Sequence, residues 1–515
     1  MGLSSRTMVR RLRAWHLGEP LTRGQTIHTA TAARNDRLLL AFVKMGGETR
    51  PWGIAWKSGS KRLEFRFVPE PRQRAAVDEM VAELGPVVAE HLQHPEFVRT
   101  EATEPADLTP LRQIWVPNGS HIDMLHHFGY TYARRQKERE HAEELRLLGR
   151  TSLYLFLESE RPGQQLVASA SDALRSAYDF PAEDTRQAHL GFLLAWLSAR
   201  GDREHGLAAA LEAEKQPVAT ALLPELERRE LSKLVESYNE ARRDENTKQM
   251  SAREKPIGEL LRPELERRLA LVGEAIEMVE TDPRPVNRGV DELVSETLKA
   301  QWWGYVKPEA VARAASKDPW VPSPETDFQA RGAAARYFRN EASADRMVSA
   351  LVHDDHELEA EAIAAGRAFR GTVVQVFDES TTKAKTLPVW RIEDPTPGPL
   401  SIRHGDTVCV VGHKKRAGTV RGIASTKGGG LVLELLITNI KTAAKNEEWP
   451  NSMHAADERW IGQIATVIGT SFAPMTDKKA FKVNSWDALP GDWVVKSPSG
   501  ERAEASETQA ETVDA

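Results

Sequence analysis

The hydrophobic pattern in the first part of the chain predicts a small α+β domain. Three short β-prone runs are separated by Gly46-Gly47 and by Ser58-Gly59-Ser60, which are residues typical of turns. This spacing predicts an antiparallel meander. Apolar residues then recur at helical spacing over residues 73–92, which predicts a helix that covers one face of the sheet. The expected strands are residues 38–45, 52–57 and 63–68.

From residue 119 to residue 307 the pattern changes to successive helices, and the β-prone runs disappear. One short sequence repeat occurs: Pro-Glu-Leu-Glu-Arg-Arg at 224–229 is found again at 263–268. Each proline stands where a first helical turn tolerates it. The spacing of about forty residues is typical of helix-pair repeats that stack on one another. The alternative is a chance repetition of a common helix-starting composition. In both cases we expect an all-α array, which a true repeat would make solenoid-like.

A proline-rich stretch at 315–332 predicts a linker, after which the pattern returns to β. Alternating pairs such as Val374/Val376 and Val408/Val410 are typical of half-buried strands. Five short strands with turn residues between them predict a small closed barrel of the OB or SH3-like kind, because closure removes exposed sheet edges. The expected strands are residues 369–377, 387–392, 407–412, 419–425 and 431–439.

Together these patterns predict a multidomain α+β protein. After residue 496 the chain has almost no apolar side chains, so burial cannot offset the entropy lost on ordering. The domains that we infer are an α+β domain at 1–110, an all-α array at 111–314, a linker with helices at 315–366, a small β-barrel at 367–445, a tryptophan-rich extension packed on the barrel at 446–496 and a disordered acidic tail at 497–515.

The composition is that of ordinary globular material, with 40% hydrophobic and 28% charged residues among 515. Cys409 is the only cysteine, which excludes an internal disulfide and fits a reducing compartment. No apolar region follows the arginines of residues 1–17, and no long apolar run occurs elsewhere. We therefore expect a cytoplasmic protein without a signal peptide or a membrane span.

The net charge of −6 conceals an uneven distribution, and the field acting on a charged partner depends on where the charges lie. Residues 1–70 contain 13 Lys and Arg against 5 Asp and Glu, and residues 367–445 contain 13 against 6. The tail at 497–515 contains 1 against 5. Two basic regions therefore flank an acidic middle.

Two expected loops of the barrel concentrate positive charge. One contains a histidine and three cations at an expected hairpin tip, and the other contains a lysine before three glycines. Mobile cations can follow a phosphate backbone and gain affinity through counterion release, while Trp390 beside Arg391 could stack on a base. The alternatives are a solvated hairpin with Trp390 in the core, or a protein contact. The predicted nucleic-acid-binding residues are His413, Lys414, Lys415, Arg416, Lys427, Trp390, Arg391, Arg10, Arg11 and Arg13.

Candidate catalytic chemistry is sparse. Residues 353–357, His-Asp-Asp-His-Glu, are metal-ligand types, but no second ligand cluster accompanies them. His121, His126 and His127 are better explained as surface and core positions of a helix. The common motifs of NTPases, dinucleotide enzymes, zinc proteases and hydrolases do not occur. We predict no metal site and no cofactor, and we assign no catalytic residue.

The charge distribution and the two basic loops predict a non-enzymatic or accessory subunit. Its basic ends would bind nucleic acid, DNA more than RNA, and its helical array would dock a catalytic partner such as a helicase or a nuclease. The setting would be DNA or RNA processing or antiviral defence, with no membrane partner. Two alternatives stay open, namely a metal-dependent nuclease without a readable motif and a protein-only scaffold.

Overall fold

The computed structural model describes residues 5–23, 26, 28, 30, 35, 37–92, 112–133, 140–160, 164–199, 203–282, 352–353, 355–380, 386–438 and 458–469. The side chains of residues 5–7, 184, 203, 380, 386, 414 and 415 are outside this description. The expected linker at 315–332, most of the tryptophan-rich extension and the acidic tail lie outside the described residues.

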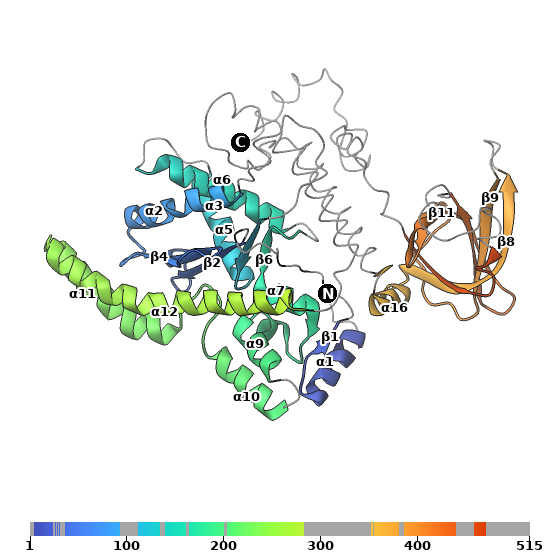
Figure 1. The fold of residues 1–515 in the computed structure, drawn as a ribbon, viewed down its shortest axis with the longest axis horizontal. Coiled ribbons are helices and arrows are strands. Elements are labelled where there is room, and N and C mark those ends of the chain that lie inside the picture. Colours follow the sequence, from blue (N-terminus) through green and yellow to red (C-terminus); the bar gives the residue numbers. More distant parts are fainter. Residues whose placement is uncertain are drawn as a thin grey trace, which may run out of the picture.

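A five-stranded mixed sheet is the centre of the first folded part (Figure 1). Its strands are β2 (Arg37–Lys44), β3 (Pro51–Ser58), β4 (Glu64–Phe67), β5 (Gln113–Val116) and β6 (Val167–Ser169). Their order is β4-β3-β2-β5-β6. The pairs β2–β3 and β3–β4 are antiparallel, whereas β5 pairs parallel with both β2 and β6.

This sheet corrects two expectations from the sequence. The pairing of β2 with β5 crosses the expected domain boundary after residue 110. The β structure also continues past residue 119, because β6 and the short strand β7 (Tyr178–Asp179) lie among the helices. Every residue of β5 and β6 is buried, so neither strand shows the alternation that identifies a half-buried strand.

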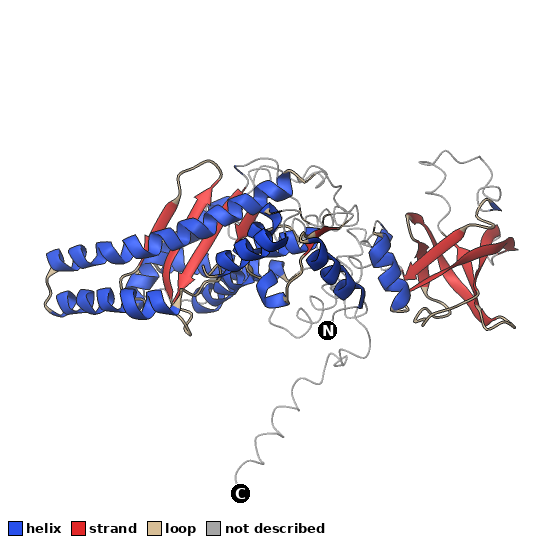
Figure 2. Cartoon of the chain, turned by 90° about the horizontal axis from the view of Figure 1, so that it is seen from below, coloured by secondary structure: helices blue, strands red, loops and turns tan. Residues whose placement is uncertain are grey.

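Helices cover both faces of the sheet (Figures 1 and 2). The side chains of β2 alternate between the two faces. Leu38 and Leu40 belong to one core, and Ala41 and Val43 belong to the other. The helices are thus outer layers of an α/β body, which corrects the separate all-α array. The helices on one side of the sheet are α2 (Arg74–Ala82), α3 (Leu84–Leu92), α5 (Gly119–Tyr132) and α6 (Ala142–Ser159). The remaining helices of the α/β body are α7 (Ala170–Ala177), α8 (Asp184–Gln187), α9 (Leu190–Ser198), α10 (Arg203–Glu214), α11 (Ser232–Arg243) and α12 (Thr247–Glu280).

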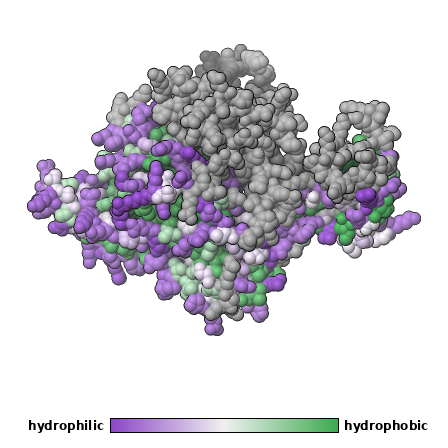
Figure 3. Space-filling model, viewed as in Figure 1, coloured by the Kyte–Doolittle hydropathy of each residue, from purple (hydrophilic) through white to green (hydrophobic). Residues whose placement is uncertain are grey.

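Helices α11 and α12 form a hairpin that extends beyond the sheet (Figure 2), and mostly hydrophilic residues cover it (Figure 3). The two copies of the repeated Pro-Glu-Leu-Glu-Arg-Arg sequence differ in structure. The first copy runs into a π-helical segment, Leu226–Leu231, immediately before α11. Pro263 of the second copy lies inside α12, so its expected place in a first helical turn is wrong. The helix-pair repeat therefore has no counterpart in the described structure.

Glycine permits close packing of α5 against α6. A Cβ atom on Gly149 would lie 2.2 Å from the backbone nitrogen of Ala133 and 2.3 Å from the carbonyl carbon of Tyr132. We expect Gly149→Ala to lower the free energy of unfolding by about 1–3 kcal/mol, because overpacking forces the backbones apart. The matched control is Gly273→Ala in α12, where nothing lies within 4 Å of the added methyl group.

The control variant is expected to gain up to about 1 kcal/mol, because alanine favours the helix over glycine. Urea unfolding followed by circular dichroism measures both changes. Similar free energies for the two variants would contradict the close packing of α5 and α6.

Helix α1 (Ser5–Leu17) packs on the α/β body through Trp15, whose ring stacks on Trp196 at a centroid distance of 6.2 Å. The following strand β1 (Leu21–Thr22) pairs with β7. Hydrophobic residues reach the surface at α1 (Figure 3), where Met8, Val9 and Leu12 are exposed. None of the helices in the described ranges has the length and apolar character needed to cross a bilayer.

A closed barrel of six antiparallel strands forms the second folded part, and the short helix α16 (His356–Ala364) precedes it (Figure 2). The strands are β8 (Ala368–Ser380), β9 (Thr386–Asp394), β10 (Thr407–Val410), β11 (His413–Ser425), β12 (Leu431–Ile437) and β13 (Ile464–Gly469). β13 pairs with both β8 and β10. The expected C-terminal β-barrel is confirmed, but it has six strands in place of the expected five, and part of the region expected only to pack on the barrel closes it.

Candidate functional site

The sequence predicted that the basic run after Gly412 forms a hairpin tip. The structure does not place these residues at a tip. The turn lies at residues 411–412, and His413 is already the first residue of β11. On β10, Cys409 pairs with Ala417 and the next residue, Val410, pairs with His413. Residues 414–416 are therefore an inserted bulge in β11, of which the side chains of Lys414 and Lys415 are outside the description.

Trp390 and Arg416 are buried inside the barrel. Trp390 is 0% exposed and belongs to the barrel core, and Arg416 is 7% exposed, with its guanidinium carbon 5.6 Å from the centre of the Trp390 ring. A base cannot stack on a ring that has no accessible face. The predicted stacking role of Trp390 is therefore corrected, and Arg416 is not a mobile surface cation.

Two other predicted cations have carboxylate partners. Arg391 lies 2.6 Å from Glu434, and Arg10 lies 2.6 Å from Asp179 and also pairs with Glu357 of α16. Both arginines were expected to face phosphates, but neighbouring carboxylates neutralise much of their charge.

The remaining predicted residues are in several environments. Arg11 and His413 are half-buried, and the ring of His413 lies edge-on to Trp460 at 4.9 Å. Arg13 and Lys427 are exposed, the first on α1 and the second between β11 and β12. The described residues of the predicted set therefore do not form one continuous basic surface.

The topology of the barrel brings Lys427, which the sequence had singled out, to the same end as two exposed cations that it had not. One end of the barrel, next to α16, contains the first residues of β8 and β12 and the last residues of β9 and β11. Exposed Arg367, Arg403 and Lys427 all lie at this end, and we call them the α16-end rim. The segment that carries Arg403 is fixed there because the backbone nitrogen of Ser401 donates to the carbonyl of Gly366 at 2.8 Å.

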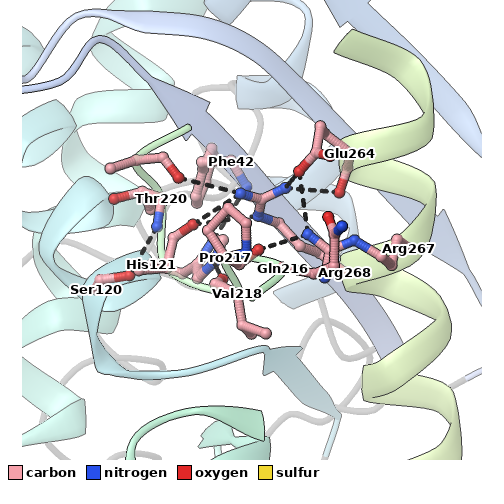
Figure 4. A network of polar contacts seen from close by, with 12 residues as sticks. Phe42, Ser120, His121, Gln216, Pro217, Val218, Thr220, Glu264, Arg267 and Arg268 are labelled. Atoms are coloured by element: carbon pink, nitrogen blue, oxygen red, sulfur yellow. Dashed lines mark hydrogen bonds and ion pairs between the residues drawn. The ribbon is translucent and has the colours of Figure 1, made fainter. Parts of the chain in front are cut away.

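The α/β body contains a buried polar network around His121 (Figure 4). Its Nδ1 atom accepts a hydrogen bond from the backbone nitrogen of Phe42 at 3.1 Å, so Nε2 carries the proton and donates to the carbonyl of Val218 at 3.0 Å. Burial lowers the pKa of His121 to about 3, against the opposing effect of the bond to Val218. The imidazole is neutral and joins two backbone segments.

Arg268 of α12 is the charged member of this network and is 0% exposed. Its guanidinium lies 2.8 Å from a Glu264 carboxylate oxygen and donates to the carbonyls of Ala219 at 3.0 Å and Ala221 at 3.2 Å. Burial lowers the pKa of Arg268 to about 10, although Glu264 opposes that shift.

These contacts hold the segment 217–221 against the end of β2, where the backbone nitrogen of Lys44 donates to the carbonyl of Thr220 at 2.8 Å. The carboxyl ends of parallel strands are a common place for ligands in α/β proteins. Here the donors of His121 and Arg268 are engaged by main-chain carbonyls, so we assign the network a structural role. The sequence did not reveal it, because His121 had been explained as a helical position and Arg268 stood out only as the last residue of the repeated Pro-Glu-Leu-Glu-Arg-Arg.

Of the metal-ligand residue types at 353–357, His353 and Asp355 serve local structure. Asp355 caps α16 by accepting from the backbone nitrogen of Glu357 at 2.8 Å. His353 accepts from the backbone nitrogen of Gly412 at 3.1 Å, and its other ring nitrogen lies 3.3 Å from the sulfur of Cys409. Among the described residues, no group of three or more His, Cys, Asp or Glu side chains is arranged to hold a metal ion.

Comparison of the chain with protein-family models, with curated proteins and with solved structures gives no match. The fold alone does not imply a function, so the function must be argued from the surfaces and sites themselves.

Proposed function

We propose that this chain is an accessory nucleic-acid-binding subunit of a DNA- or RNA-processing or antiviral-defence complex, and that it docks a catalytic partner such as a helicase or nuclease. The observation that supports nucleic-acid binding is the α16-end rim, where Arg367, Arg403 and Lys427 are exposed at one end of a closed barrel. These side chains project from a rigid scaffold and carry charge that a polyanion attracts.

The expected mode of binding is electrostatic and independent of sequence. Each phosphate neutralised by a lysine or arginine releases counterions, so affinity falls as salt rises. Three such contacts predict a slope of log affinity against log salt of about −2 for single strands and about −3 for duplex DNA.

The helical hairpin supports the second half of the proposal. α11 and α12 extend past the sheet, and their tip exposes both acidic and basic side chains, such as Arg243, Glu245 and Lys248. A rigid projection with charges of both signs suits a specific protein contact more than a polyanion, because complementary charges give register and selectivity. We therefore assign partner docking to this hairpin and nucleic acid to the barrel.

The test is the triple variant Arg367→Ala/Arg403→Ala/Lys427→Ala, with binding to single- and double-stranded oligonucleotides measured across a salt series. We expect the salt slope to become shallower by about 2–3, because three phosphate contacts are lost. The matched control is Lys233→Ala/Arg243→Ala/Lys248→Ala, which removes the same charge from exposed positions of the hairpin. A separate Lys414→Ala/Lys415→Ala variant measures the contribution of the β11 bulge.

An unchanged salt slope in both barrel variants would exclude the barrel as the nucleic-acid interface. A similar loss in the hairpin control would show a nonspecific charge effect in place of a defined surface.

One observation favours the protein-only scaffold as a second candidate. Arg391 and Arg421 on the barrel both lie 2.6 Å from carboxylates, those of Glu434 and Glu379, which reduces the field that a polyanion would meet. A scaffold would show no retention on heparin or on nucleic acid at low salt, but would retain a stable protein partner. The metal-dependent nuclease predicts instead that labelled DNA or RNA is degraded only when Mg²⁺ or Mn²⁺ is added.

A further inference from the structure

Helix α1 has three large apolar side chains on its outward side. Met8 is 53% exposed, and Val9 and Leu12 are each 62% exposed. Helical geometry places them next to one another, because residues three or four positions apart lie on the same face. Single exposed apolar side chains are ordinary, but a contiguous group of them is typical of an interaction surface. We call these three residues the α1 patch.

The opposite side of α1 is fixed to the α/β body. Ala14 is 0% exposed, and the ring of Trp15 stacks on the fully buried ring of Trp196. Arg10 adds an ion pair, since its Nε atom donates to a carboxylate oxygen of Asp179 at 2.6 Å. A rotation that turned the α1 patch inward would break all of these contacts. The exposure of the patch is therefore set by the packing of the helix.

The charged side chains of α1 are all basic. The helix contains four arginines and no aspartate or glutamate. Arg13 is exposed four positions after Val9, and His16 is exposed four positions after Leu12, so both lie beside the α1 patch, one turn further along. A partner that covers the patch meets positive charge at its border. Carboxylates are the complementary groups on such a partner.

We propose that the α1 patch docks an amphipathic helix of a partner protein, with apolar side chains in its centre and carboxylates beside them. An apolar helix face of this kind buries the patch by packing against α1. A second copy of α1 is not complementary, because two such helices bring together only cations. A lipid surface is also disfavoured, since Trp15, the aromatic side chain that would anchor α1 at a bilayer, stacks inside the protein.

This contact goes beyond the docking that we assign to the α11–α12 hairpin. The tip of the hairpin lies at the far end of the α/β body from α1 (Figures 1 and 2). Helix α1 contacts α10 and β7 instead. The two surfaces can therefore be changed separately, and variants of one serve as controls for the other.

The test uses two labelled synthetic peptides of about three heptads, designed to form amphipathic helices with leucines on one face. The first has glutamates beside the leucines, and the second has lysines in their place. Each is titrated with the full chain and followed by fluorescence anisotropy. We expect the glutamate peptide to bind saturably and more tightly than the lysine peptide.

The apolar half of the proposal is tested with Met8→Ser/Leu12→Ser, the patch variant. Binding of the glutamate peptide is expected to weaken by about tenfold or more, because two apolar contacts are lost. The matched control is Val374→Ser/Ile464→Ser, which removes two apolar side chains that are 42% and 59% exposed on the barrel. Its affinity for the peptide should equal that of the unmodified chain.

The charged half is tested with Arg13→Glu. This variant should bind the glutamate peptide less tightly and the lysine peptide more tightly, because an attraction becomes a repulsion. We expect the ratio of the two affinities to change by about tenfold. Lys248→Glu on the hairpin makes the same change of charge at another exposed position and should leave the ratio unchanged.

Equal affinities of the two peptides for the unmodified chain, or unchanged binding to the patch variant, would overturn the proposal. Self-association that the patch variant abolishes, measured by sedimentation, would identify a second copy as the occupant instead. Flotation with phosphatidylserine vesicles that depends on the patch would identify a membrane. The triple variants of the α16-end rim and of the hairpin should keep the peptide affinity, so a failure of the proposed function is distinguishable from a failure of this proposal.

Discussion

Replacing Arg268 with alanine is expected to lower the free energy of unfolding by about 3–5 kcal/mol, the cost of breaking a buried ion pair by removing one partner. Glu264, which is largely buried, would keep only Arg267 as a cationic partner, at 3.0 Å, and the carbonyls of Ala219 and Ala221 would lose their donors. An unpaired buried acceptor cannot recover its hydrogen bonds unless water enters. The segment 217–221 should therefore separate from the end of β2.

Urea unfolding of the full chain measures this loss. The control is Arg262→Ala on the same helix, where the guanidinium is half exposed and lies 3.5 Å from Glu266. Exposed pairs of this kind contribute less than about 1 kcal/mol. Equal unfolding midpoints for the two variants would mean that the buried network does not hold the segment 217–221.

Acidification from pH 7 to pH 5 is expected to destabilise the α/β body by about 4 kcal/mol through two buried histidines, about 2 kcal/mol each. Burial lowers the pKa of His121 to about 3 and that of His91 to about 4, although each ring also bonds a backbone carbonyl. In the unfolded chain both take up protons below about pH 6.5. The unfolded state therefore binds more protons as the pH falls, and stability that is fully present above that pH is lost progressively toward pH 4.

The measurement is the free energy of urea unfolding at a series of pH values. His91→Gln removes the contribution of one of these histidines and should reduce the loss of stability between pH 7 and pH 5 by about 2 kcal/mol. His404→Gln is the control, because that side chain is exposed in the barrel and should leave the slope unchanged. A slope that is insensitive to His91→Gln would show that other groups govern the acid response.

A strand can be predicted from the sequence when its own residues show the hydrophobic pattern of a strand. The runs predicted at 38–45, 52–57 and 63–68 overlap β2, β3 and β4, and the barrel strands are visible in the same way. β5 and β6 have four and three residues, all buried, so they carry neither alternation nor length. Their pairing with a strand far earlier in the chain is a long-range property that local periodicity does not contain.

The candidate site was harder to predict than the fold, because a cation's role depends on what lies beside it. Arg10 is basic in the sequence, yet its partner Asp179 is 169 positions away. The sequence allowed two interpretations of Trp390, a stacking surface or a core residue. Trp390 is fully buried in the barrel, so the second interpretation is correct. The rim formed by Arg367, Arg403 and Lys427 could not be seen, since only the strand directions bring these positions to one end.

The closing strand of the barrel sets the order in which this part of the protein can fold as it leaves the ribosome. β8 through β12 are synthesised first, but the edges of β8 and β10 stay open until β13 pairs with both. Open edges are templates for pairing with other chains. The barrel is therefore most vulnerable to aggregation between the synthesis of Ile437 and that of Gly469, and a chaperone that covers strand edges would act in that interval.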